Sequence, residues 1–501
     1  MRSLGLVSLL FASARFAAAW PADLKASRTG EFTHAGKSYA SSSIIRVQWV
    51  PPEAAVTSFR ITAADRRSGV RAVAAPDSSA IDIELLKAGT EYRVSIQACL
   101  DAECTETLDG DESAVVTTEL EHWRVQGAGR SYNTAARVVP DGNVGSYAMR
   151  YGPWAGPELD GRIQLYYNPM QREEKGIKIG ELVAPKGDTI ESASLFRGVS
   201  GFGLLRVCDQ QPSAACAASR SLAMNLALFQ AVPLAGENKV RLYFEAQGFD
   251  GRTRILYLDS QDGYLGRDFH PGTPTICAAI ADYAPGGACE PALAIGVDID
   301  GARGNANLLN ARQFKIFYPA QDSWAWDQAV GTALWFTTEW PNGRCSSYGF
   351  NAAYAVWDGA RWAVQYQENG CPKILAGAQA PMPVHIAGAR YKVYFNKHPQ
   401  PGGVTNPQTA LKPMRMLYAD PERSGDAALV EFEDWEPLED ARQIRYLWPD
   451  GTLLTDAEHS LLDDYMILAP GANPRELIMY SNMSASMQQP PFIGSAVLVN
   501  P

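Results

Sequence analysis

The chain of 501 residues lacks the short signatures of the common enzyme classes. It has no Gly-x-Ser-x-Gly nucleophile elbow, no His-Glu-x-x-His zinc motif, no P-loop and no Gly-x-Gly-x-x-Gly fingerprint. Its six histidines are scattered, which argues against a histidine-based triad or metal cluster. Cys-x-x-Cys is also absent, so zinc is not expected. We therefore expect no metal and no cofactor, and any chemistry must come from carboxylates and aromatic side chains.

The sequence also lacks a long hydrophobic run and a basic charge balance. No segment reaches the ~20 apolar residues of a membrane span. A net charge of −11 argues against binding to nucleic acid or to an anionic membrane. The start of the chain is typical of a signal peptide over residues 1–19, with Arg2, an apolar stretch at 4–11 and small residues at 12–14 or 17–19 where cleavage could occur. We expect an exported protein, secreted or at the cell surface.

The cysteine count fits an oxidising compartment. There are eight cysteines, which fall into sequential neighbours: Cys99 with Cys104, Cys208 with Cys216, Cys277 with Cys289, and Cys345 with Cys371. Sequence alone permits ~105 pairings. The local pairing is favoured because each loop is short, and we expect four disulfides.

Residues 38–119 contain short alternating strands around Trp49. In "LLKAGTEYRVSIQAC", Val94 and Ile96 are expected on one face, after a turn at Gly89. Tyr92 stands where a tyrosine corner would hydrogen-bond to the upstream backbone. The run L-x-x-G-T-x-Y-x-V-x-I-x-A resembles a fibronectin type III domain, which implies a β-sandwich that acts as a spacer or adaptor. No Arg-Gly-Asp tripeptide supports integrin-type adhesion.

One strand pattern occurs five times, as "GRIQLYYNP", "NKVRLYFEA", "RQFKIFYPA", "ARYKVYFNK" and "RELIMYSN". The central aromatics are Tyr166, Tyr243, Phe317, Tyr394 and Tyr480. Their spacing of about 75 to 85 residues suits one four-stranded propeller blade with long loops. We predict an all-β protein in which a fibronectin type III-like sandwich precedes a five-bladed β-propeller at 122–501. An irregular tandem of sandwiches would not keep so constant a period, and a sixth blade lacks residues.

The remaining strands of each unit can be assigned around the repeated one. An apolar strand precedes it, a third strand follows it, and fourth strands are predicted at 354–367 and 444–451. The last unit ends at its third strand. We predict that its fourth strand comes from 122–129, because closing the ring across the termini removes exposed sheet edges.

Loops on one face of this propeller carry the candidate site. Asp298 and Asp300 are two apart on a strand and project to one side, where such a pair could raise one pKa to make a general acid, or bind a cation. Glu245 ends "RLYFE" where this face begins. The substrate-binding candidates are three tryptophans that offer flat stacking surfaces, Trp324, Trp326 and Trp340. The alternative is that these residues are solvated turn carboxylates and blade-core tryptophans.

The architecture, with the pair "EPALAIGVDIDG" and "QFKIFYP", resembles the furanosidase-type glycoside hydrolases. That family places an aspartate base, a second aspartate and a glutamate acid around the central channel. Glu290 before Pro291 matches the family's acidic-Pro start, and Asp141 precedes the first inner strand. The family's His-Asp-Pro or Arg-Asp-Pro signature is replaced by "VVPDGN". The resemblance implies catalytic roles for Glu290 and Asp141, and together with Asp298 and Glu245 these are the catalytic candidates.

Two hypotheses follow. The first is an exported glycan-directed protein that binds or hydrolyses a polysaccharide at the propeller mouth. The second is a non-catalytic extracellular interaction or adhesion protein that presents its loops to a protein partner. Carboxylates converging on the channel would favour the first.

Overall fold

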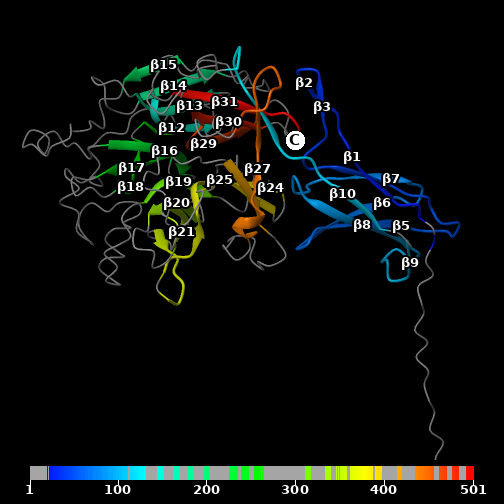
Figure 1. Ribbon diagram of the computed structural model, residues 1–501. Helices are drawn as coiled ribbons and strands as arrows, with labels where there is room; N and C mark the ends of the chain where they lie inside the picture. Colours follow the sequence, from blue (N-terminus) through cyan, green and yellow to red (C-terminus); the bar gives the residue numbers. More distant parts are fainter. Residues whose placement is uncertain are drawn as a thin grey trace, which may run out of the picture. The chain divides into compact units, whose positions relative to one another are not determined.

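The computed structural model consists almost entirely of β-strands, as predicted (Figure 1). The described residues include the short 3-10 helix η6 (Leu438–Asp440). The structure describes residues 20, 22–110, 113–130, 144–151, 162–169, 178–183, 197–201, 225–234, 238–247, 253–260, 262–263, 311–317, 333–339, 346, 348, 350–357, 362–369, 371–387, 390–397, 414–419, 435–455, 462–470, 477–483 and 492–501. The expected signal peptide lies outside these residues.

The chain forms two compact units. Unit 1 comprises Met1–Gly30 and Ala40–Glu119, and unit 2 comprises Glu31–Tyr39 and Leu120–Pro501. Unit 1 has two antiparallel sheets, of order β1-β4-β7 and β10-β8-β5-β6, with β9 paired to β8. Their strands are β1 (Lys25–Arg28), β4 (Ile45–Gln48), β5 (Ser58–Ala64), β6 (Gly69–Ala74), β7 (Ala80–Ile83), β8 (Glu91–Cys99), β9 (Thr107–Asp109) and β10 (Ala114–Thr117).

The core of unit 1 confirms the alternation predicted from the sequence. Along β8 buried and more exposed residues alternate, with Val94 and Ile96 in the core. Trp49 is also buried there, with its ring 5.1 Å from that of Phe59. The buried Tyr92 hydroxyl accepts a hydrogen bond of 2.8 Å from the backbone N–H of Lys87, which is the predicted tyrosine corner.

Unit 2 contains five larger sheets that follow one another along the chain. Their orders are β12-β13-β14-β15, β16-β17-β18, β19-β20-β21-β22 with β23 on β21, β24-β25-β26-β27, and β28-β11-β31-β30-β29. The strands are β11 (His122–Val125), β12 (Val144–Tyr151), β13 (Arg162–Pro169), β14 (Lys178–Val183), β15 (Arg197–Gly201), β16 (Asn225–Leu234), β17 (Lys239–Gln247), β18 (Thr253–Asp259), β19 (Ala311–Phe317), β20 (Ala333–Glu339), β21 (Phe350–Trp357), β22 (Trp362–Val364), β23 (Ile374–Ala376), β24 (Ala378–Ala387), β25 (Arg390–Lys397), β26 (Met414–Tyr418), β27 (Arg442–Gln443), β28 (Arg445–Leu447), β29 (Leu462–Pro470), β30 (Leu477–Met483) and β31 (Phe492–Leu498).

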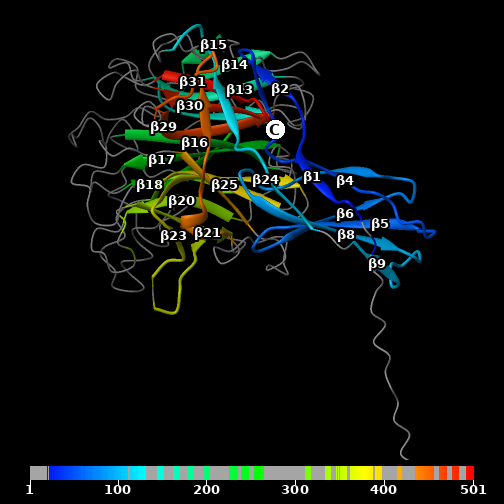
Figure 2. The ribbon, with the colours of Figure 1, turned by 45° about the vertical axis from the view of Figure 1, so that its right-hand side comes forward.

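The first described strands of these sheets contact one another in the order β12, β16, β19, β24 and β29, and β12 also contacts β29. In Figure 1 the colours run through the sheets from green to red, and Figure 2 shows the neighbouring strands β20 and β24 of successive sheets side by side. This succession is that of a five-bladed β-propeller, as predicted.

The repeated strand occupies the second position of its sheet. It forms β13, β17, β25 and β30, each paired to the strand that precedes it in the chain. The third copy forms β19. The strand predicted before β19, around residue 295, lies outside the described residues.

The fifth sheet combines strands from both ends of unit 2. β11 pairs with β31 through Trp123 opposite Leu498, as predicted for the fourth strand of the last blade. One assignment was wrong: 444–451 was predicted as the fourth strand of the fourth blade. Instead β28 pairs in parallel with β11 in the fifth sheet, and the two-residue β27 completes the fourth. A strand of three residues, such as β28, could pair with the edge of the fourth or of the fifth sheet, so its sequence pattern could not decide between them.

A hairpin from the N-terminal part also belongs to unit 2. Its strands are β2 (Phe32–His34) and β3 (Lys37–Tyr39). The buried His34 lies with its Nε2 atom 3.2 Å from the carbonyl oxygen of Trp448, and Lys37 donates from Nζ to the carbonyl of Gly451. The hairpin therefore packs beside the turn that follows β28.

Candidate functional site

Most of the predicted site residues lie outside the described residues. These are Asp298, Glu290, Asp141, Trp324, Trp326 and Trp340. Glu245 is placed through its backbone, in β17, opposite Ala227 of β16 and Ile255 of β18. It stands two residues before the end of its strand.

In four of the five sheets of unit 2 the strand registers define one end, which we call the mouth end. There the first residue of the first strand lies opposite the last residue of the second strand. The pairs are Val144 with Pro169, Asn225 with Gln247, Ala378 with Lys397, and Leu462 with Met483. Glu245 therefore belongs to the mouth end of the second sheet.

The fourth sheet shows how side chains change toward this end. In β25 the buried residues Val393, Tyr394 and Phe395 are apolar or aromatic. The next residue, Asn396, is 2% exposed and lies opposite Gln379 of β24, which is 3% exposed. Buried amide groups require hydrogen-bonding partners, so the mouth end of this sheet is a polar layer beside an apolar core.

A tyrosine is held at the same place by a glycine. Gly377, immediately before β24, has φ of +74°, and a Cβ atom there would stand 2.8 Å from the ring of Tyr348. The side-chain oxygen of Asn351 accepts hydrogen bonds from the Ser346 hydroxyl at 2.6 Å and from the Gly377 N–H at 3.2 Å. This network fixes the turn and leaves the half-buried Tyr348 lying against it.

Two cations lie on one face of the fourth sheet at its mouth end. Arg415 of β26 is opposite Phe395, and Lys397 is two residues further along β25, so Lys397 and Arg415 are diagonal neighbours about 7–8 Å apart. Both are half-buried. Burial lowers the pKa of Lys397, the Arg415 charge lowers it further, and Glu439 of η6 partly opposes the shift.

A second polar cluster lies deeper in the core and is closed. Glu121 accepts hydrogen bonds from Lys392 Nζ at 2.7 Å, Tyr394 hydroxyl at 2.8 Å and Trp123 Nε1 at 3.0 Å. All four residues are 7% exposed or less. Burial first, and then the Glu121 charge, raise the pKa of Tyr394 well above its usual value. This cluster connects the segment before β11 to β25, and its role is structural.

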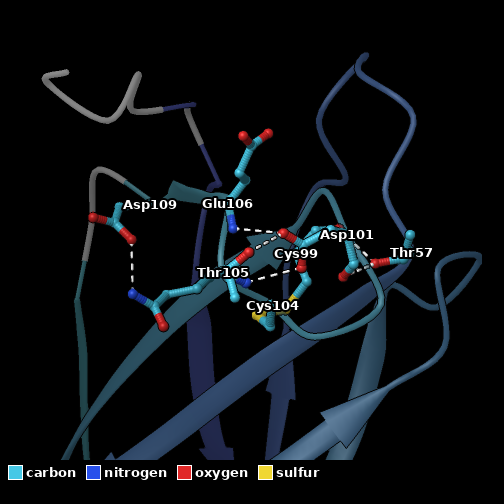
Figure 3. The surroundings of a disulfide bond; sticks show 8 residues. Thr57, Cys99, Asp101, Cys104, Thr105, Glu106 and Asp109 are labelled. Atoms are coloured by element: carbon cyan, nitrogen blue, oxygen red, sulfur yellow. Dashed lines mark hydrogen bonds between the residues drawn. A yellow bond between two sulfur atoms is a disulfide. The ribbon is translucent and has the colours of Figure 1, made fainter.

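The predicted disulfide framework is confirmed in part. Cys99 is bonded to Cys104, and Cys371 is bonded to a cysteine outside the described residues. The first bond closes the turn after β8, where Asp101 accepts hydrogen bonds from the backbone N–H groups of Thr105 and Glu106 (Figure 3). The other predicted pairs lie outside the described residues.

Two further findings concern the described part of the chain. No three histidine, cysteine, aspartate or glutamate side chains are grouped there so as to hold a metal ion. Nor does that part contain a helix with the length and apolarity needed to cross a membrane.

Sequence reasoning missed the mouth-end residues of the fourth sheet. A signal for one of them was present in the repeat. Asn396 stands two residues after the central aromatic of "YKVYFNK", and Asn168, Glu245 and Asn482 stand at the same offset in three other copies. Aligning the five copies would have singled out this position. Nothing in the sequence indicated that Tyr348 would lie against Gly377.

Comparison with known proteins finds a family match for the N-terminal part of the chain. The family description "Fibronectin type III domain" matches residues 34–118. No curated protein matches the sequence. Among solved structures, a thermostable family-43 glycoside hydrolase is 10% identical with a TM-score of 0.41, over 72% of this chain and 92% of that one.

Two other solved structures illustrate each part. The catalytic domain of a GH62 alpha-L-arabinofuranosidase from Coprinopsis cinerea is 10% identical with a TM-score of 0.38, over 76% of this chain and 97% of that one. The FN5 domain of Drosophila Lar is 20% identical with a TM-score of 0.15, over 20% of this chain and 94% of that one. At these identities the likenesses carry no activity to this chain. The N-terminal part is similar to fibronectin type III domains.

Proposed function

We propose that this is an exported, glycan-directed protein that binds or hydrolyses a polysaccharide at the mouth end of its propeller. The observation that carries the proposal is the polar layer at this end. In the fourth sheet, buried apolar residues give way there to the buried amides Asn396 and Gln379. A sugar ring presents hydroxyl groups and an apolar face, so its site needs convergent polar groups beside an aromatic surface.

The repeat extends this layer to other sheets. The position two residues after the central aromatic is Asn168 in the first copy, Glu245 in the second, Asn396 in the fourth and Asn482 in the fifth. Each lies within the repeated strand near its mouth end. Amides in three sheets and a carboxylate in one would give a ring of hydrogen-bonding groups, with a single ionisable member.

Hydrolysis would require a second carboxylate near Glu245. A glycosidase places an acid and a base, or an acid and a nucleophile, about 5 to 10 Å apart across the scissile bond. Asp141, Glu290 and Asp298 are the candidates, and Asp141 stands three residues before β12 begins at the mouth end of the first sheet. Trp324, Trp326 and Trp340 would supply further stacking surfaces beside Tyr348.

Export is part of the proposal. The apolar, small-residue start of the chain supports it, and so do the disulfide at Cys99 and Cys104 and the bonded state of Cys371. N-terminal sequencing of secreted protein should place the mature start near residue 20. A mature protein that retains residues 1–19 would contradict it.

The test is reducing-sugar release by the mature protein across a broad polysaccharide panel, together with binding to the same panel. Glu245→Gln, Asp298→Asn, Glu290→Gln and Asp141→Asn are assayed singly. Glu53→Gln, an exposed carboxylate of unit 1, is the matched control and should behave as wild type. Release that is lost in a mouth variant and kept in the control establishes hydrolysis. Binding without release establishes a glycan-binding protein. A protein that neither binds nor cleaves any glycan is instead an interaction protein, and the proposal is wrong.

A further inference from the structure

The mouth end of the fourth sheet carries positive charge in an overall acidic protein. The chain has a net charge of −11, yet Lys397 and Arg415 share one face of adjacent strands. Two like charges at this separation repel each other, and partial burial strengthens the repulsion. A negative group between or beside the two cations would relieve this repulsion.

The described part of the chain supplies no such group to Lys397. Among the described residues and their contacts, no carboxylate lies within salt-bridge distance of its Nζ atom. Glu439, the acidic residue that acts on it, is exposed on η6 and offsets only part of the effect of burial. Partial burial of a cation without an anion is unfavourable, so the charge of Lys397 does not itself stabilise the fold.

The surroundings of Lys397 are those of a binding surface. Its strand partner is Ala378, which follows Gly377, and Gly377 supports the half-buried Tyr348. The Tyr348 ring therefore lies against the turn that leads into the first strand of the fourth sheet, and Lys397 and Arg415 lie on its second and third strands. The ring offers a flat apolar surface and the cations offer charge-assisted hydrogen bonds.

We infer that this rim, formed by Tyr348, Lys397 and Arg415, binds an anionic sugar, so that the preferred glycan is an acidic polysaccharide rather than a neutral one. The sugar ring stacks on Tyr348, and its carboxylate or sulfate accepts hydrogen bonds from the two cations. The inference rests on the proposed function, because it specifies the glycan that the mouth receives.

The experiment compares each acidic polysaccharide with a neutral form of the same backbone. Polygalacturonate is tested beside its methyl ester, and glucuronoxylan beside its carboxyl-reduced form; a sulfated galactan is tested beside its desulfated form. Dissociation constants are measured with wild type, Lys397→Gln, Lys397→Glu and the control Arg66→Gln, an exposed cation of unit 1. Lys397→Gln removes a charge that has no ion pair, so it should leave the fold intact.

Wild type should bind at least one acidic form about tenfold more tightly than its neutral counterpart, the value of one charge-assisted contact. Lys397→Gln should remove most of that preference, Lys397→Glu should reverse it, and Arg66→Gln should keep it. The preference should also shrink with added salt. Which pair shows the effect distinguishes a carboxylate from a sulfate.

Other results overturn the inference in distinguishable ways. Equal binding of acidic and neutral forms refutes the anionic site but leaves the proposed glycan function standing. A preference for acidic forms that survives Lys397→Glu places the charge recognition elsewhere. The absence of binding to every polysaccharide, acidic or neutral, refutes both the inference and the proposed function.

Discussion

Replacing Glu121 with leucine should destabilise unit 2 by about 3–5 kcal/mol, because it breaks a buried ion pair from one side. The carboxylate is 2% exposed and its partner Lys392 is 7% exposed. Once the carboxylate is gone, the ammonium group stays buried with no counter-charge, 4.9 Å from the centre of the Tyr394 ring. That ring offers a weaker attraction than the carboxylate 2.7 Å away.

The geometry also predicts an asymmetry between the two partners. Glu121→Leu removes the acceptor of three donors, from Lys392, Tyr394 and Trp123, whereas Lys392→Met leaves the carboxylate with the phenol and the indole. Each buried neutral donor left unpaired costs about 1–3 kcal/mol. Glu121→Leu should therefore be the more damaging of the two. The double variant should recover more than half of the sum of the single losses, because it removes both charges.

The assay is equilibrium unfolding in denaturant, monitored by tryptophan fluorescence and analysed as two transitions. The transition of unit 1 serves as an internal reference, because Glu121 and Lys392 both belong to unit 2. Lys25→Ala removes an exposed ion pair with Asp23 and should change stability by less than about 0.5 kcal/mol. A loss below about 1 kcal/mol for Glu121→Leu would refute the reasoning, as would a double variant no more stable than additivity predicts.

Three further predictions concern single residues. Tyr92→Phe should destabilise unit 1 by about 1–3 kcal/mol in denaturant unfolding, because the buried N–H of Lys87 loses its acceptor. Burial disfavours the charged form of Asp65, but the ion pair with Lys87 at 2.9 Å outweighs burial and lowers the pKa of Asp65. The stability of unit 1 should therefore fall as the pH drops below about 4, and this fall should be smaller in Asp65→Asn. Gly377→Ala should weaken glycan binding because the added methyl group displaces the Tyr348 ring. Gly36 also has a positive φ, of +75°, but open space around it, so Gly36→Ala should lower stability by about 1–2 kcal/mol and leave binding unchanged.

Much of the fold follows from periodic features of the sequence. Alternation along Glu91–Cys99 is a local property, and it predicted which residues of β8 are buried. The five copies of the aromatic strand predicted five sheets, because a blade cannot bury both faces without neighbours. The strand that completes the fifth sheet could be predicted because the last unit lacked a fourth strand and the segment 122–125 belonged to no other unit.

What could not be predicted depends on long-range pairing or on single residues. β28 has three residues, and its parallel pairing with His122–Val125 joins positions far apart in the sequence. The assignment of Glu31–Tyr39 to unit 2 follows from contacts such as that of His34 with Trp448, which join positions far apart in the sequence. From the sequence, Glu121 would be expected to be a solvated residue before a strand, because Lys392 and Tyr394, which bind it, are far away along the chain.

The fifth sheet is where the stability of the ring is expected to be decided. Pairing Val125 with Ala496 closes a loop of about 370 residues, which costs roughly 4 kcal/mol more than closing a five-residue hairpin. Three features offset that cost at the same strand: the Glu121 cluster beside it, the parallel strand β28 along its other edge, and the hairpin that packs beside the turn after β28. Because the other four sheets need only local pairing, weakening any of these three should open the ring at β11 first. The mouth end would then lose its shape before the individual sheets unfold, which couples the proposed glycan site to a cluster that lies deeper in the core.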